Sequence, residues 1–393
     1  MTGYEGQAPS DVPQVDDETQ ERLSLLRDSA SKFVLSENHV KRSRQLRGTK
    51  PGYDPQIWRQ LASMGWLGTL LPETYGGLGL GCTEMAVVAE FMGRALFPEA
   101  ITPAMVLAGG ALLYGDNPAL KAELLPAMAA GELLPALAWR EQQHDCDLLA
   151  VETVAEETST GIKLSGRKCL IIPGANASGF IVSAQSRQGI GLYWVPAETV
   201  ASALSLVELA DGRLAAELTF SGLEVPRSHQ VAGVEVAKSA LTRAYDEALI
   251  IASAELYGVM SVAMEITLEY LRTRVQFGKP IGSFQALQHR TVDLYVQQRM
   301  CRHALDEVLA GVSVPDVALV ARSALASRIK ARCSDASLKI TRQSIQMHGA
   351  IGFSDECDIG LFLKRAVVLS GWLGGTQVHQ RRFARLSPPT VED

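Results

Sequence analysis

Three acidic residues in the second half of the chain have neighbours that make them candidates for chemistry. Asp246 and Glu247 are adjacent, and Glu255 lies within the apolar run Ile250–Tyr257. A carboxylate among apolar side chains usually has a partner or a raised pKa, and such groups are candidates for a functional site. For Glu255 we favour a structural ion pair inside a helix bundle.

Glycine-containing segments form a second group of candidates, spread over most of the chain. They are Trp66–Leu80, Leu164–Lys168, Arg274–Gln285 and Gln346–Phe353. The first of them, taken alone, is a structural turn, because glycine adopts positive φ at little cost. An arginine such as Arg274 can bind phosphate oxygens in a fork, and a glycine turn lets a backbone approach closely.

Length and composition indicate a globular protein of two to three domains. The chain has 393 residues, of which 47% are hydrophobic and 20% are charged. Its net charge of -6 gives no overall positive field, so we expect no nucleic-acid partner. The most apolar windows are interrupted by Pro103 and Glu255. No membrane span is therefore expected, and the segment Met1–Glu18 lacks the pattern of a signal peptide.

The cysteines and histidines predict no metal site and no disulfide framework. Six cysteines are scattered without the spacing of a zinc site, and His289, His303 and His348 also lack metal-ligand spacing. Free thiols in a reducing cytoplasm are the simplest explanation.

Periodicity of the apolar residues divides the chain into three parts. Residues 1–132 show helical spacing and predict an all-helical N-terminal domain. Residues 133–233 contain short β-branched or aromatic runs between turn residues, which predict an antiparallel β domain. Residues 234–393 return to long helical stripes and predict a C-terminal four-helix bundle. The fold class is therefore α+β.

The four glycine-containing segments, in this order, resemble the acyl-CoA dehydrogenase family of flavoproteins. The segment Arg274–Gln285 is the most specific of them. The resemblance implies a middle β-barrel domain and FAD bound between that domain and the bundle, usually in a tetramer. It also implies α-proton removal from an acyl-CoA thioester by a carboxylate, with hydride transfer to FAD and an electron-transfer flavoprotein as acceptor.

The resemblance implies that FAD is held partly by a neighbouring subunit. The positions of this chain that match the contacts lent to the neighbour are Arg274, Phe277, Gln285, Gln346 and Gly349. Thr376, at the start of the last helix, matches a further cofactor contact. Ala350 replaces the second glycine of the turn after Gln346.

Positions that resemble the chain's own flavin contacts depart from the family pattern. Where the family has Thr-Glu-Pro followed by Gly and Ser residues, this chain has Trp139-Arg140-Glu141-Gln142, and Leu170-Ile171-Ile172 replaces the family's aromatic-Ile-Thr trio. An isoleucine cannot give the hydroxyl hydrogen bond of a threonine. The flavin contacts from this chain's own half are therefore weakened or remodelled.

The catalytic base is the sharpest departure. The usual glutamate position is Gly374 here, and no Asp or Glu occurs from Ile359 to Val391. A minority of the family carries the base on the first bundle helix, at a place that corresponds to Ala248. Glu247 could serve only after a shift in register, because one residue turns a helix by about 100°.

The resemblance also suggests where an acyl-CoA would bind. Tyr245 and Asp246 are similar to a thioester contact of the family, but the arginine expected three residues later is Leu249. Small residues at Ala248 and Gly374 open space, which favours a large acyl group.

We therefore expect a subunit of a heteromeric α2β2 acyl-CoA dehydrogenase whose homologous partner carries the base. Such enzymes are known for bulky substrates such as steroid side-chain thioesters. Two alternatives stay open: a self-sufficient homo-oligomer that uses Glu247 or Asp246 as base, and a non-catalytic, flavin-free scaffold.

Overall fold

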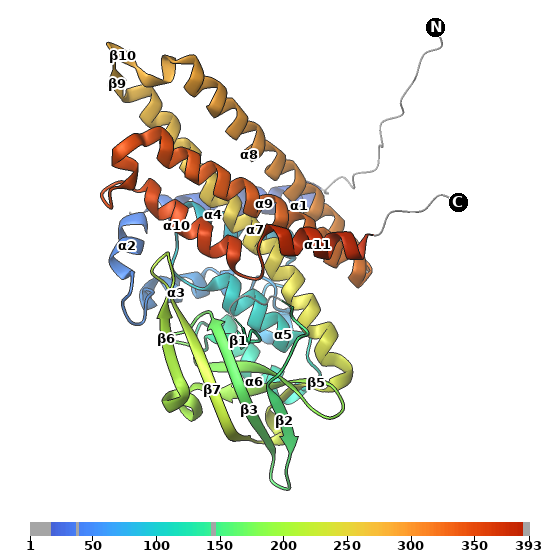
Figure 1. Ribbon diagram of the computed structural model, residues 1–393. Coiled ribbons are helices and arrows are strands. Elements are labelled where there is room, and N and C mark those ends of the chain that lie inside the picture. The colour runs from blue at the N-terminus through green and yellow to red at the C-terminus, as the bar shows by residue number, and fades with distance from the viewer. Residues whose placement is uncertain (1–16, 37–38, 143–146, 388–393) are drawn as a thin grey trace, which may run out of the picture.

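The computed structural model describes residues 17–36, 39–142 and 147–387, and its first part is helical (Figure 1). Asp54 caps α3 by accepting a hydrogen bond from the Gln56 amide, with Pro55 in the first turn. The helices of this part are α1 (Asp17–Leu35), α2 (His39–Leu46), α3 (Pro55–Ser63), α4 (Cys82–Arg94), the π-helical η3 (Thr102–Ala108), α5 (Gly109–Leu113) and α6 (Pro118–Ala129).

The middle of the chain folds into one eight-stranded sheet. Its path runs β6-β7-β3-β2-β4-β5-β8, and β1 pairs with β4 in parallel. The strands are β1 (Pro135–Ala138), β2 (Val154–Glu157), β3 (Ile162–Ile171), β4 (Gly179–Gln185), β5 (Ile190–Pro196), β6 (Leu204–Glu208), β7 (Leu214–Val225) and β8 (Gln230–Ala232).

The predicted antiparallel β-barrel is wrong, because this sheet is mixed and open. Within the described residues, β6 pairs only with β7 and β8 only with β5, so the two edges do not join. The sheet covers its faces in another way. Ile181 of β4 packs into the helical core, while its neighbours Phe180 and Val182 pack into a separate core of the sheet itself. Helices thus bury the face that a barrel would have buried by closing.

The C-terminal part is a helical bundle with five helices in the described chain, where the sequence predicted four. The helices are α7 (Val234–Thr273), α8 (Gln285–Val312), α9 (Leu319–His348), α10 (Ile359–Gly371) and α11 (Thr376–Leu386), and the hairpin β9 (Val275–Gln276) and β10 (Lys279–Pro280) joins α7 to α8. The apolar spacing over residues 361–385 predicts one helix, but the structure divides it into α10 and α11 because Leu373 and Gly374 have φ values of +60° and +101°. These values cannot continue a right-handed helix.

Helix α7 is the central helix of the molecule. It is long and apolar enough to span a membrane, but 83% of its most apolar window is buried inside the protein. Gly93 of α4 and Gly258 of α7 allow direct backbone contact. A Cβ on Gly93 would lie 2.1 Å from the Glu255 carbonyl oxygen, and one on Gly258 2.0 Å from that of Glu90. The long apolar stretch is therefore a core helix that packs against α4.

Candidate functional site

The loop between α10 and α11 occupies the position where the resemblance places a catalytic glutamate. Gly374, at this position, has a φ of +101° that residues with a side chain rarely adopt. The hydroxyl of Tyr245 and the Nε2 of His379 both donate to the carbonyl oxygen of Leu373, the latter at 2.8 Å. The loop is thus fixed by hydrogen bonds from α7 and α11.

A buried ammonium group holds the same loop from α9. Lys330 Nζ donates to the carbonyl oxygens of Leu369, Ser370 and Gly374 at 3.0, 3.1 and 3.1 Å. Burial, together with the charge of Lys330, lowers the pKa of His379 to about 3. The imidazole is therefore neutral near pH 7, and the loop that carries Gly374 lies next to a cation.

Asp246 points from α7 toward α9 and α11. Arg382 Nη1 lies 2.7 Å from its carboxylate, and the hydroxyl of Ser323 donates to it. Burial raises the pKa of Asp246 even though Arg382 and Ser323 act to lower it. The predicted thioester contact is thus occupied by an ion pair within the chain.

Glu247 points to a different side of the same helix, as the turn of about 100° per residue requires. The hydroxyl of Tyr114 lies 2.8 Å from both carboxylate oxygens, and Arg243 and Arg322 lie at 3.4 and 3.7 Å. Burial raises the pKa of Glu247. Tyr114, Arg243 and Arg322 also line a cavity of about 480 Å³ on this side.

A larger cavity of about 730 Å³ lies on the side of Tyr245. We call it the α7–α11 cavity. Its wall is formed by the chain after β1, the start of α7, the start of α9 and α11. The lining residues are Asp147, Leu148, Leu149, Glu235, Lys238, Ser239, Thr242, Tyr245, Leu319, Val320, Ser323, Val378, Arg381, Arg382, Arg385 and Leu386. The structure therefore places the predicted contact Tyr245 at a cavity and keeps Glu247 out of that cavity's wall.

The residues predicted to serve a neighbour's FAD belong to one end of the bundle. Arg274 follows the end of α7, Gln285 begins α8, and Gln346 and Gly349 lie at the end of α9. The successive helices α7, α8 and α9 are antiparallel to one another, so the end of α7, the start of α8 and the end of α9 lie at the same end of the bundle (Figure 1). The rings of Tyr270 and His348 stack at 4.4 Å and join α7 to α9 there.

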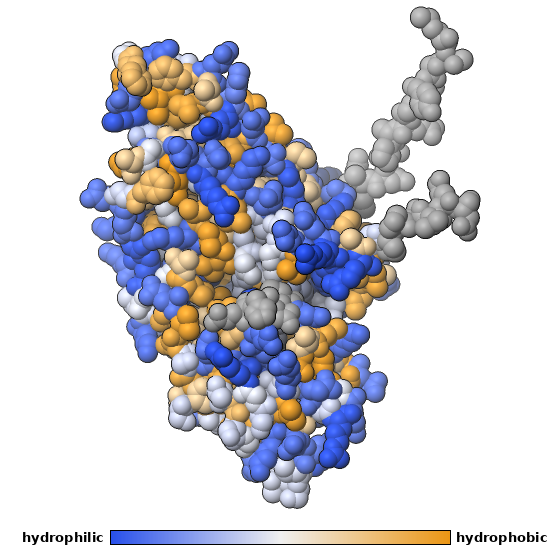
Figure 2. Space-filling view, in the orientation of Figure 1, coloured by the Kyte–Doolittle hydropathy of each residue, from blue (hydrophilic) through white to orange (hydrophobic). Residues whose placement is uncertain are grey.

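The side chains at this end are open to solvent. Phe277 is 91% exposed, and Arg274, Gln285 and Gln346 are also exposed. Figure 2 shows apolar surface here, at the upper end of the bundle. Gly349 has a φ of +67°, and a Cβ added to it would meet nothing within 4 Å. The geometry leaves room for a ligand or a second chain above this turn.

The sheet contributes a buried ion pair that the sequence did not single out. Lys168 Nζ lies 2.6 Å from Glu141 Oε1 and 3.0 Å from Ser183 Oγ. Burial lowers the pKa of Lys168 to about 8. Ile172, which replaces the family's threonine, is buried and packs into the helical core. The signal for the pair was present in the Leu164–Lys168 segment, but its acidic partner comes from a distant part of the sequence.

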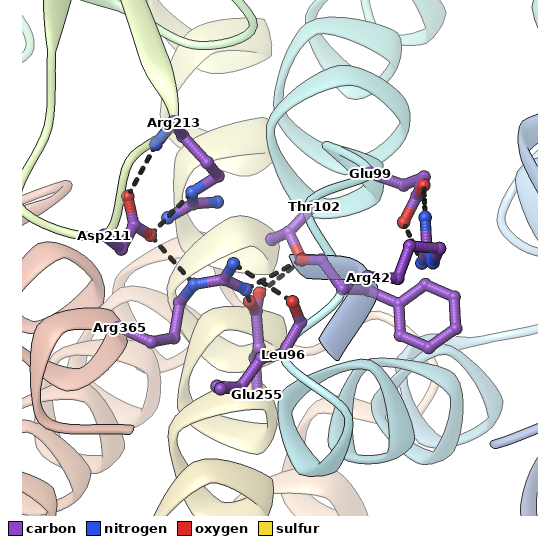
Figure 3. Close-up of polar contacts among 9 residues, drawn as sticks. Arg42, Leu96, Glu99, Thr102, Asp211, Arg213, Glu255 and Arg365 are labelled. Carbon is purple, nitrogen blue, oxygen red and sulfur yellow. Dashed lines mark hydrogen bonds and ion pairs between the residues drawn. The ribbon is translucent and has the colours of Figure 1, made fainter. Parts of the chain in front are cut away.

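Glu255 forms the predicted ion pair. Figure 3 shows its carboxylate beside Arg365, at 3.2 Å, and Arg365 also binds Asp211 at 2.8 Å. Arg213 binds the same Asp211 at 2.7 Å. Arg365 Nη1 further donates to the Phe97 carbonyl at 2.8 Å. This network connects the N-terminal helices, the sheet and the bundle, so Glu255 has a structural role.

Two family models match this chain on either side of the sheet. The model described as acyl-CoA dehydrogenase, N-terminal domain, matches residues 20–132, and the model described as acyl-CoA dehydrogenase, C-terminal domain, matches residues 232–386. The chain belongs to the acyl-CoA dehydrogenase family.

Individual members of the family resemble it over nearly the whole length. Acyl-CoA dehydrogenase FadE27 of Mycobacterium tuberculosis is 26% identical over 385 residues, which cover 94% of this chain and 96% of that protein. A structure of a variant of the Tcur3481–Tcur3483 steroid ACAD is 29% identical with a TM-score of 0.83, covering 93% of this chain and 98% of that chain. The ChsE4–ChsE5 complex from Mycobacterium tuberculosis has the same fold, with a TM-score of 0.82, 24% identity, and coverage of 95% and 98%.

This member of the acyl-CoA dehydrogenase family is an FAD-dependent enzyme, as its relatives are. Its residues fit the nucleotide end of an FAD site better than the flavin end. The exposed Arg274 and the open turn at Gly349 fit the anionic, nucleotide end of the cofactor. The sheet does not fit the flavin end in the usual way, because Ile172 is packed in the core and offers no hydroxyl. The predicted contact Thr376 lies in the first turn of α11, half-buried.

Proposed function

We propose that this chain is one subunit of a heteromeric acyl-CoA dehydrogenase whose homologous partner carries the catalytic base. In the reaction an acyl-CoA thioester loses its α proton to the partner's carboxylate and a hydride from its β carbon, giving an α,β-unsaturated thioester. FAD, when bound, accepts the hydride. This chain's part is to lend Arg274, Phe277, Gln285, Gln346 and Gly349 to the cofactor of the partner.

The loop around Gly374 is the observation that carries the proposal. A glycine cannot accept a proton, and the carbonyl of Gly374 already accepts a hydrogen bond from Lys330 at 3.1 Å. The ammonium group of Lys330 beside this loop would also lower the pKa of a carboxylate placed there, which would weaken that carboxylate as a general base. The absence of a base at this position supports a base supplied by another chain.

The distance along α7 between Tyr245 and Arg274 supports the proposal that two subunits contribute different parts of one site. Tyr245 lines the α7–α11 cavity, and Arg274 follows the end of the same helix, 29 positions later. At a rise of 1.5 Å per residue the two positions are about 43 Å apart. That is longer than an extended dinucleotide, so Arg274 and the α7–α11 cavity serve different cofactor molecules.

The exposed surface of α8 supports an assembly of more than one chain. Val292, Tyr295, Val296 and Met300 are 46–58% exposed, and their spacing puts them on one side of the helix. Apolar side chains that line up in this way are typical of a surface covered by another protein. The 29% identical structure named as Tcur3481–Tcur3483 is itself named as a pair and as a steroid ACAD, which favours a heteromer and a bulky acyl group.

Glu247 favours the second candidate, a homo-oligomer with a relocated base. Its carboxylate is buried and burial raises its pKa, as is typical of a general base. Against this candidate, Tyr114 and two arginines already bind the carboxylate, and Glu247 does not line the cavity that contains Tyr245. The heteromer is therefore the better supported of the two.

Co-expression with an acyl-CoA dehydrogenase homologue encoded beside this chain tests the proposal. Flavin per chain and reduction of a dye acceptor with acyl-CoA are measured for each chain alone and for the pair. We expect flavin and turnover only in the pair, and we expect Arg274→Gln to lower flavin content of the pair while Arg272→Gln does not. A lone chain that is yellow and bleaches with acyl-CoA, and loses this with Glu247→Gln, supports the homo-oligomer. A colourless chain that no homologue activates supports the scaffold.

We also propose the three domains 1–132, 133–233 and 234–393, a cytoplasmic location and an electron-transfer flavoprotein as the electron acceptor. The division follows the helical, sheet and helical parts described above. The buried, unpaired thiols of Cys82, Cys169, Cys301 and Cys333 are compatible with a reducing compartment.

A further inference from the structure

We infer that Cys301 and Cys333 are an oxidation site and form a disulfide that joins α8 to α9 when the surrounding thiol pool becomes oxidised. Both thiols are free in the structure and lie outside the sites described above, so the inference is independent of the proposed function. In a reducing compartment such a bond is absent at rest and is formed and broken by thiol–disulfide exchange.

The two thiols lie against each other between the helices. Both side chains are fully buried, and the thiol of one forms a hydrogen bond with the thiol of the other. Cys301 Sγ also lies 3.9 Å from the carbonyl oxygen of Arg332, the residue that precedes Cys333 in the chain. Sulfur atoms already in contact across two packed helices need only a small movement to reach the S–S bond length of about 2 Å.

The neighbours of Cys301 favour it as the attacking thiolate. The hydrogen bond from the Cys333 thiol and the guanidinium of Arg332 lower the pKa of Cys301, although burial opposes them. The hydrogen bond to Cys301 and burial raise the pKa of Cys333 well above its ordinary value. The thiolate is the nucleophile in disulfide exchange. Cys301 therefore reacts first and Cys333 second.

Helix α8 can separate locally from α9 at little cost. Between Gln285 and Met300 the helix has a single buried side chain, Leu294. Met300, next to Cys301, is 52% exposed, and its sulfur lies 3.4 Å from the guanidinium of Arg332. Segments with few buried apolar contacts open most readily. A small oxidant can therefore reach Cys301 without unfolding of the whole chain.

The reaction balances with a small disulfide as the oxidant. The Cys301 thiolate attacks one sulfur of the small disulfide, whose S–S bond breaks and releases one thiolate. Cys333 then loses its proton and attacks Cys301 Sγ, which forms the protein disulfide and releases the second thiolate. The two thiol protons pass to the released thiolates, and two electrons from the protein thiols reduce the small disulfide. The product fixes α8, with its exposed apolar stripe, to α9.

Hydroxyethyl disulfide added to the purified full-length chain tests the site. After the remaining free thiols are blocked, a non-reduced tryptic digest is analysed by mass spectrometry. We expect the peptides Met300–Arg302 and Cys333–Lys339 to be joined in most chains. We also expect the bond to raise the melting temperature by about 5 °C, and dithiothreitol to reverse the rise.

Cysteine variants assign the change to this pair. Cys301→Ala/Cys333→Ala should show no rise in melting temperature on oxidation. The matched control Cys82→Ala/Cys169→Ala, which removes two other buried cysteines, should keep the full rise. In Cys333→Ala the reagent should stay attached to Cys301, and in Cys301→Ala position 333 should stay unmodified. Each variant is compared with its own reduced form, so a loss of stability from the substitution itself does not enter.

The peptide result needs no variant, so it decides even if a substitution prevents folding. Absence of the joined peptides while the half-buried Cys357 has reacted overturns the inference, because the reagent is then active. Joined peptides from another cysteine pair in equal amount also overturn it, as does an equal rise in melting temperature in Cys301→Ala/Cys333→Ala. None of these failures affects the proposed division of labour, which is measured by flavin and turnover in the pair.

Discussion

A side chain at position 374 should destabilise this protein without creating a dehydrogenase. Gly374 has a φ of +101°, and a Cβ there would lie 3.0 Å from His379 Nε2 and 3.1 Å from a methyl carbon of Val378. A residue forced into such a glycine conformation costs about 1–3 kcal/mol. His379 has little freedom to retreat, because it is buried and donates to the Leu373 carbonyl at 2.8 Å. We therefore expect Gly374→Ala to lower the free energy of unfolding by about 2 kcal/mol.

Urea unfolding followed by circular dichroism measures this cost. The matched control is Gly371→Ala, because Gly371 has no positive φ and a Cβ there would meet nothing within 4 Å. That substitution should change the free energy of unfolding by less than about 0.5 kcal/mol or raise it slightly, since alanine restricts the unfolded chain. The difference between the two variants isolates the backbone conformation at position 374.

Gly374→Glu carries the same strain and adds the carboxylate that typical family members have. We expect no bleaching of added FAD by acyl-CoA in this variant, because the loop is bound by Lys330 and His379 in a conformation made for glycine. A Gly374→Glu chain that is as stable as wild type and oxidises acyl-CoA alone would refute the reasoning. It would mean that the loop tolerates a base and that the site of this chain is complete.

Three further predictions concern buried charges. Arg365→Met leaves the buried Glu255 without its cation and leaves Asp211 with Arg213 alone, so it should lower the free energy of unfolding by about 3–5 kcal/mol. The exposed ion pair broken by Arg47→Met should cost less than about 1 kcal/mol, and urea unfolding measures both values. Glu247→Gln keeps the shape of the side chain, so turnover of the reconstituted pair should stay within about twofold, and a loss of a hundredfold or more in steady-state kinetics would assign the base to Glu247. The pKa of His379 is about 3 in the folded protein, below the ordinary histidine value of 6.5, so the unfolded chain binds a proton first as the pH falls. The contribution of His379 to the free energy of unfolding should be complete above about pH 6.5 and decrease by about 2 kcal/mol when the pH falls to 5. The melting temperature of His379→Gln should therefore depend less on pH over this range than that of the wild type.

Sequence patterns were sufficient to predict the helical parts of the fold, because a helix is determined largely by residues that are close together in the sequence. Asp54, Pro55 and the apolar spacing after them are neighbours in sequence and are enough to predict α3. The structure has that cap and that helix. Apolar periodicity alone misses the break between α10 and α11, because the apolar stripe continues across it, whereas the resemblance places the start of the last helix at Thr376. Only the φ values of Leu373 and Gly374 end the helix, and glycine by itself does not reveal which of its conformations is used.

The sheet and the site depended on contacts between distant residues. The sequence shows short runs typical of strands. A barrel differs from an open sheet in whether the two edge strands pair with each other, and short apolar runs contain no information about that pairing. The adjacent Asp246 and Glu247 could not be told apart as candidate bases from sequence. Their partners Arg382 and Tyr114 lie far from them and from each other in the sequence, so the pairs are visible only in the folded structure.

The antiparallel bundle gives a physical reason why contacts with a neighbour's cofactor and the chain's own base site can change independently. The contacts proposed for a neighbour's cofactor lie at the ends of α7 and α9, whereas the Gly374 loop and the α7–α11 cavity lie about 43 Å away along α7. Substitutions separated by this distance have nearly additive effects on stability, so neither end constrains the other. A chain can therefore keep Arg274 and the Gly349 turn for a partner while a glycine and a buried lysine replace the base at its own end. In a homo-oligomer both ends would be needed in every copy, and the loss of one would be a loss of function in all of them.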